Sequence, residues 1–190
     1  MIHPLKHSID SKLDQALSSS EWSIFFDFCQ TKSFRKKDRL LSEGQHSRNL
    51  FYVVEGLLFA NQINQDGDKQ VTQFAREDYW IADLYSFFSG EKAIYTIEAL
   101  EETKVICLSR ENFEKACKQA PALDRYFRIL FQNAYVANQQ RILGRMTLDA
   151  KSRYEDLVEH NPDLVKRVPQ FLLASYLGIK PQSLSRIRKR

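Results

Sequence analysis

Hydrogen-bond donors crowd the C-terminal end of the chain, where no acidic residue follows Asp163. An arginine can bond two acceptors of one guanine, a glutamine can do the same with adenine, and lysine and serine suit phosphate oxygens. This chemistry predicts that Gln182 and Arg186 read bases, with the backbone amide of Gln170 available for a phosphate at a helix start. The full predicted DNA-binding set is Gln170, Lys180, Gln182, Ser183, Ser185, Arg186 and Lys189.

Net charge divides the chain in the same way. Residues 161–190 carry seven lysines and arginines against one aspartate, a net charge of +6, whereas the other 160 residues hold 21 basic and 23 acidic groups. A nearly neutral body with a compact basic end is typical of a nucleic-acid-binding terminus. A solvated basic tail is the alternative, but the apolar positions and turn signals of this segment favour a folded element.

The spacing around Gly178 predicts the element that presents these donors. Leu177 precedes Gly178, which can adopt the left-handed conformation of a tight turn, and Pro181 suits the first turn of a following helix. Leu184 and Ile187 then fall on the inward side of that helix. The pattern predicts a helix-turn-helix whose second helix enters the major groove. An ordinary helical hairpin is the alternative.

A long helix is predicted from Pro121 to about Arg145, with two apolar stripes at helical spacing. One stripe can cover a β-domain while the other meets a second copy of the chain. A single helix packed on its own domain is the alternative. The stripe assigned to dimerisation is Leu123, Phe127, Leu130, Ala134, Ala137 and Arg141. The adjacent stripe is Tyr126, Ile129, Val136 and Leu143.

The remainder of the chain predicts helices followed by short strands. Residues 5–31 have helical spacing, with N-cap chemistry for a second helix at Ser20 and Ser23. Thr147 and Asp149 likewise predict the cap of a later helix that runs to about Val158. From Phe34 to about Leu108 the apolar runs shorten and alternate with turns such as Asp66-Gly67, which indicates an antiparallel jelly roll. The aromatic run 79–88 is expected either to line an apolar pocket or to be core.

Composition excludes several classes of protein. The chain has 190 residues, of which 43% are hydrophobic, enough for a core and too many for a disordered chain. No apolar run approaches the ~20 residues that span a bilayer, and no secretory leader is visible. Three widely spaced cysteines and four histidines show neither a disulfide framework nor zinc spacing. Hydrolase, phosphate-loop and metalloprotease motifs are absent, so we predict no catalytic residue, metal or cofactor.

The order of these elements resembles the Crp/Fnr family of bacterial transcription regulators over essentially the whole chain. The β-region is similar to the family's cyclic-nucleotide-binding domain at Leu50–Gly56, at the Gly67 hairpin, and at Ala99 and Phe113. Residues 173–190 resemble its helix-turn-helix. The resemblance implies an α+β fold of N-terminal helices, an antiparallel jelly roll, a long dimerisation helix and a small DNA-binding domain.

The same resemblance implies a sequence-specific, dimeric DNA-binding regulator, not an enzyme, in the bacterial cytoplasm. Its parts would be an effector domain over 1–118, a dimerisation helix over 119–145 and a helix-turn-helix domain over 146–190. Double-stranded DNA and a second copy are the expected partners, RNA polymerase and an unidentified small-molecule effector are further ones, and no membrane is expected. The hairpin that many members carry after the second helix is expected to be absent or removed. The alternative is a ligand-binding or protein-interaction module that is related to cyclic-nucleotide-binding domains but does not bind DNA.

The family's phosphate cassette bears on whether the effector is a cyclic nucleotide. Members that bind one present Gly-Glu-Leu and, further along, Arg-Ser/Thr-Ala, whose arginine neutralises the phosphate. This chain has Ala82-Asp83-Leu84 and Ala93-Ile94-Tyr95, and Lys92 should point to the opposite face of its strand. Losing a charge-assisted contact to a buried phosphate predicts that cyclic AMP does not bind. The degenerate effector pocket is predicted at Asp83, Leu84, Lys92, Ala93, Ile94 and Tyr95.

Overall fold

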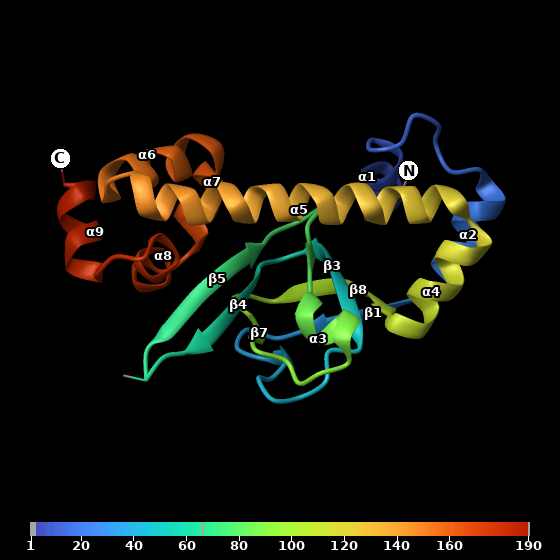
Figure 1. The fold of residues 1–190 in the computed structure, drawn as a ribbon, viewed down its shortest axis with the longest axis horizontal. Helices are drawn as coiled ribbons and strands as arrows, with labels where there is room; N and C mark the ends of the chain where they lie inside the picture. The colour runs from blue at the N-terminus through green and yellow to red at the C-terminus, as the bar shows by residue number, and fades with distance from the viewer. Residues whose placement is uncertain (1–2, 66, 190) are drawn as a thin grey trace. The chain divides into compact units, whose positions relative to one another are not determined.

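A computed structural model describes residues 3–65 and 67–189, which form two compact units (Figure 1). The first unit contains Met1–Ala60 and Phe74–Asn133, and the second contains Asn61–Gln73 and Ala134–Arg190. Asp66 of the predicted hairpin turn and Arg190 of the basic end lie outside the described residues, whereas Gly67 has a left-handed φ of +83°.

The first unit combines strands with helices at its start and end. The strands are β1 (Cys29–Phe34), β2 (Arg39–Leu41), β3 (Asn49–Glu55), β4 (Leu58–Ile63), β5 (Lys69–Ala75), β6 (Trp80–Ile81), β7 (Thr96–Ala99) and β8 (Thr103–Ser109). Of the β4–β5 hairpin, Asn61–Gln73, which includes most of β5, belongs to the second unit. The helices are α1 (Pro4–Asp10), α2 (Ser19–Asp27), α3 (Leu84–Ser89), α4 (Arg110–Gln119) and the first part of α5 (Pro121–Thr147).

The strands form two sheets, in the orders β1-β8-β3-β6 and β2-β7-β4-β5. β3 and β8 pair antiparallel, with Tyr52 opposite Ile106, and both of these side chains face the helices. Their neighbours Phe51 and Val105 face the other way, into the cluster that includes residues of the second sheet. Alternate side chains of one strand point to opposite faces, so burial of both faces explains the continuous apolar runs in β3 and β8. The predicted antiparallel jelly-roll core is confirmed.

Aromatic rings dominate the core between β3 and the helices. Phe127 of α5 is 1% exposed and lies 4.9 Å from the Phe113 ring and 5.6 Å from the Trp80 ring, edge to face in both cases. The Trp80 indole donates to the Tyr126 hydroxyl at 2.9 Å, which satisfies a polar group at the margin of this core. Phe87 is fully buried here as well. The aromatic run 79–88 therefore contributes Trp80 and Phe87 to the core.

The helical region predicted over residues 5–31 does contain two helices, α1 and α2, but the prediction is wrong in two respects. Its second part begins after Ser18, which caps α2 in a reciprocal capping box with Glu21, so Ser20 and Ser23 are not the caps. The helix ends at Asp27, and Cys29–Phe34 is strand β1, with Gln30 opposite Cys107 of β8. Pairing with a distant strand overrides the local helical spacing.

The second unit is helical apart from its hairpin segment. After α5 it contains α6 (Ala150–His160), α7 (Pro162–Arg167), α8 (Gln170–Leu177) and α9 (Pro181–Arg188). The Asp149 side chain accepts from the Ser152 amide at 2.8 Å and caps α6, as its position in the sequence predicts. The core side chains are Leu157, Leu164, Val168, Leu172, Leu173, Ala174, Leu177 and Leu184. Across the described residues, no helix is long and apolar enough to cross a membrane.

Candidate functional site

The turn between α8 and α9 is built around Gly178. Its φ of +69° lies in the left-handed region that glycine adopts without strain. The amide of Ile179 donates to the carbonyl of Ala174 at 2.9 Å, and the Gly178 amide donates to that of Ser175 at 3.0 Å. These bonds satisfy the carbonyls at the end of α8, and α9 then starts at Pro181. The turn is therefore fixed by the local sequence.

One face of α9 carries free donors. At 3.6 residues per turn, Gln182, Arg186 and Lys189 lie within roughly 60° of one another around the axis, opposite the fully buried Leu184. All three side chains are exposed, and none makes a hydrogen bond or ion pair with any described residue. A row of unpartnered donors with no carboxylate beside it suits a polyanion.

The other predicted DNA contacts flank this row. Lys180 is the N-cap of α9 and is exposed, as is Ser183, whereas Ser185 is half-buried and lies to one side. Gln170 is the first residue of α8, so its amide lies among the unpaired N–H groups of that helix start. Arg188, which is outside the predicted DNA-binding set, is also exposed but lies on the side of Leu184.

Two arginines of α5 bind α8, a role that residue spacing did not reveal. Arg145 donates to the carbonyl of Tyr176 at 2.6 Å, and burial together with the neighbouring Arg141 lowers the pKa of its guanidinium. Arg141 lies 5.5 Å from the centre of the Tyr176 ring and donates to the carbonyl of Thr72. Both arginines thus act within the second unit, where they hold the first helix of the helix-turn-helix.

Ser175 of α8 contacts the hairpin segment of the same unit. Its hydroxyl donates to the carbonyl of Lys69 at 2.6 Å and accepts from the amide of Val71 at 2.9 Å. One side chain therefore satisfies a carbonyl and an amide on the same strand.

The structure corrects the predicted dimerisation stripe of α5. Leu123 and Phe127 are 0% and 1% exposed in the core of their own unit, Leu130 packs against that core, and Arg141 is engaged as described above. Side chains buried within one chain are unavailable to a second copy, so only Ala134 and Ala137 of this stripe remain exposed. The opposite face is apolar and open. Its exposed side chains are Tyr135, Val136, Ile142, Leu143 and Met146.

Asp83 lies at the centre of the predicted effector pocket and is fully buried. One carboxylate oxygen accepts from the Ser86 amide at 2.9 Å and caps α3, while the other accepts from the amides of Ile94 and Tyr95 at 2.7 and 3.0 Å. Ala93 is buried, and its amide donates to the carbonyl of Gln45 at 2.6 Å. Asp83 thus links α3 by hydrogen bonds to residues 93–95, the segment in which cyclic-nucleotide binders of the family have the phosphate-binding arginine.

The other predicted pocket residues are more open. Leu84 and Tyr95 are half-buried, Ile94 is 39% exposed, and Lys92 is exposed. Within the described residues, no group of three or more His, Cys, Asp or Glu side chains is placed to hold a metal ion.

The chain is similar to known proteins over much of its length. Residues 31–120 match the cyclic nucleotide-binding domain family. The chain is 28% identical over 122 residues to the cAMP-dependent protein kinase regulatory subunit of Debaryomyces hansenii, a match that covers 60% of this chain and only about a quarter of that protein's length. It is 19% identical over 179 residues to the cAMP-activated global transcriptional regulator CRP of Salmonella typhimurium, covering 89% of this chain and 84% of that protein.

The same fold is also found among solved structures. FixK2 from Bradyrhizobium japonicum superposes with a TM-score of 0.72 at 18% identity, over 85% of this chain and 83% of that one. The chain has a Crp/Fnr-type fold. The resemblance predicted from the sequence is thereby confirmed at the level of fold, and the Crp/Fnr-type relatives are transcription regulators.

Proposed function

We propose that this chain is a DNA-binding transcription regulator that acts as a dimer. The observation that carries the proposal is the row of unpartnered donors on α9, mounted on a tight turn at Gly178 in a Crp/Fnr-type fold. In this proposal residues 1–118 form the effector-type domain, 119–145 the dimerisation helix and 146–190 the DNA-binding domain. RNA polymerase and a small-molecule effector are further proposed partners.

The donors divide into base readers and phosphate anchors. Gln182 and Arg186 lie one turn apart on α9, Gln182 in its first turn and Arg186 in its last, on the face from which a recognition helix reaches base edges. Lys180, Ser183 and Lys189 flank them and hold phosphates. Half-buried Ser185 supports the edge of the row, and the amide of Gln170 binds a phosphate at the start of α8.

The open apolar face of α5 is the proposed dimer contact. Tyr135, Ile142 and Met146 recur in steps of seven and four, and with Val136 and Leu143 they span roughly 120° of the helix surface. Large exposed apolar patches are typical of interaction surfaces. A two-fold dimer through this face presents two copies of α9 to half-sites about 10 base pairs apart.

The test is a binding-site selection from random duplex DNA, followed by a salt titration, with the wild-type chain and two variants. Arg186→Ala should lose roughly 1–3 kcal/mol at one base pair of each half-site and relax the preference there. Lys189→Ala should weaken binding to all sequences alike and flatten the salt slope by about one unit per site.

The matched pair makes the outcome decisive, because both residues are exposed cations on one face. If Arg186→Ala kept the base preference and only Lys189→Ala changed it, the assignment of reader and anchor would be wrong. If the wild-type chain bound no duplex at low salt, the DNA-binding proposal itself would fail in favour of a ligand-binding or protein-interaction module.

A further inference from the structure

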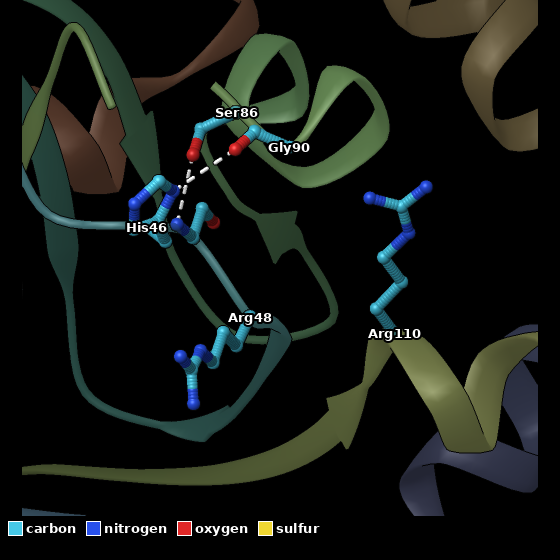
Figure 2. A pocket seen from close by; sticks show the side chains of 6 residues that line it. His46, Arg48, Ser86, Gly90 and Arg110 are labelled. Carbon is cyan, nitrogen blue, oxygen red and sulfur yellow. Dashed lines mark hydrogen bonds between the residues drawn. The ribbon is translucent and has the colours of Figure 1, made fainter. Parts of the chain in front are cut away.

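A hollow of about 360 Å³ opens in the first unit at the C-terminal end of α3 (Figure 2). Figure 2 shows His46 and Arg48 on one loop and Arg110 on a separate element, the start of α4. Neither Asp83 nor the Ala93–Tyr95 segment lines it, so it is distinct from the degenerate cassette. The lining residues are His46, Ser47, Arg48, Ser86, Gly90 and Arg110.

Ser47 is the polar group in this hollow that lacks a partner. The residue is 5% exposed, and its hydroxyl makes no hydrogen bond with any part of the chain that the structure describes. Its position is nevertheless fixed, since its amide donates to the Ser86 hydroxyl at 2.8 Å and that hydroxyl donates to the carbonyl of Glu91 at 2.6 Å. A buried hydroxyl without a partner is costly, so one held in place at a hollow points to a ligand.

The lining is basic and includes no carboxylate. The guanidinium of Arg48 makes no ion pair with any described residue. Arg110 meets Glu114 at 3.6 Å, but both side chains are about half exposed, so this pair is weak and can yield to a better acceptor. The His46 ring is held by its Nδ1, which donates to the carbonyl of Gly90 at 2.9 Å. Positive charge is therefore available on two sides of the hollow.

We propose that this hollow binds the phosphate group of a small phosphomonoester, with Arg48 and Arg110 as the charged donors and the Ser47 hydroxyl as the third. A guanidinium presents paired N–H groups that match two phosphate oxygens. The volume exceeds that of a phosphate ion and lies at the lower end of small-molecule pockets, which leaves room for a short organic group. The site does not depend on the proposed DNA-binding function, because no residue of α8 or α9 lines it.

The test is a titration of the full chain with glycerol 3-phosphate, followed by amide NMR shifts, with glycerol and sodium chloride at matched ionic strength as blanks. Saturable shifts at Ser47 and Gly90 are expected. Arg110→Gln and Arg48→Gln should each weaken binding about tenfold or more, the size expected for one charge-assisted contact. Arg39→Gln, an exposed arginine of β2 outside the hollow, is the matched control and should bind as the wild type does.

Ser47→Ala separates a ligand contact from a structural one. It should weaken glycerol 3-phosphate binding, yet leave the melting temperature of the free protein unchanged or higher, because it removes a buried hydroxyl that has no partner. Shifts that grow linearly without saturation, or an equal loss in Arg39→Gln, would overturn the proposal in favour of unspecific ionic contact. Saturable shifts at Ile94 and Tyr95 instead would place the anion in the cassette and overturn it as well.

Discussion

Both carboxylate oxygens of Asp83 accept from amides of its own chain, and the Ala93 side chain offers neither charge nor donor to a phosphate. A ribose hydroxyl would have to displace one of those amide bonds. We therefore expect millimolar cyclic AMP to leave both the melting temperature and the DNA affinity unchanged, because a ligand stabilises the native state only in proportion to its binding. Scanning fluorimetry with AMP as the control checks this. A rise of several degrees with cyclic AMP and none with AMP would mean that another cation, such as Lys92, replaces the arginine.

Burial disfavours ionisation of the three thiols in the folded chain. Burial raises the pKa of Cys29 to about 12 and those of Cys107 and Cys117 to about 11. Because the thiolate is the reactive form, alkylation by iodoacetamide at pH 8 should be far slower in the native than in the unfolded protein. Mass spectrometry of both samples over time checks the ratio, and equal rates would contradict it.

These thiols also give the stability of the protein a pH dependence of defined sign. The pKa values of the folded thiols lie above the unfolded value of about 8.5, so the stability that the buried neutral thiols contribute is fully present below that pH. This stability is lost as the pH rises toward the folded pKa values of about 11 and 12. Urea unfolding at pH 7, 9 and 10.5 should show a falling midpoint, and the triple Cys→Ala variant should lose this part of the fall.

Hydrogen bonds of the Asp83 carboxylate join α3 to the segment before β7. Asp83→Ala removes the acceptor of three amides, and each buried N–H left without a partner costs roughly 1–3 kcal/mol, so a loss of at least about 3 kcal/mol is expected. Asp149→Ala, which removes an exposed cap of α6 with one bond to Ser152, should cost less. Urea denaturation followed by circular dichroism compares the two. Equal losses would show that Asp83 caps a helix and braces nothing else.

The elements that could be predicted from sequence are those with local causes. Proline at a helix start, the cap at Asp149 and the left-handed Gly178 each act within a few residues, and the donor row on α9 follows from helical spacing alone. Strand β1 depends on β8, far along the chain, so local spacing wrongly assigned its first three residues, 29–31, to a helix.

The stripes of α5 illustrate the same limit. Periodicity defines two apolar stripes but not which one meets the chain's own core, and the contacts of Phe127 with rings from other elements decide that. The hollow beside α3 could not be predicted from the sequence either, because it depends on a contact between Ser47 and Ser86, which are 39 positions apart.

For the whole molecule, the assignment of α5 faces predicts which substitution dissociates a dimer. Ile142→Glu places a charge in the open apolar face and should give monomers that bind DNA much more weakly. Ala137→Glu is also on exposed α5 surface, but on the stripe first predicted from sequence, and should leave the dimer intact. Sedimentation velocity at micromolar concentration measures both. A wild-type chain that sediments as a monomer would refute the dimer, and dissociation by Ala137→Glu alone would restore the first stripe.

The paired bonds of Ser175 have a consequence for solubility. β5 lies at the edge of its sheet, and the amides and carbonyls of an edge strand are templates for pairing with a strand of another molecule. The Ser175 hydroxyl occupies one such amide and one such carbonyl, those of Val71 and Lys69, as a neighbouring strand would. Helix α8, which precedes the proposed DNA-contacting helix, thereby also shields part of this strand edge. A Ser175→Ala chain should scatter more light on prolonged incubation than the wild type, even if it still recognises the same DNA sequence.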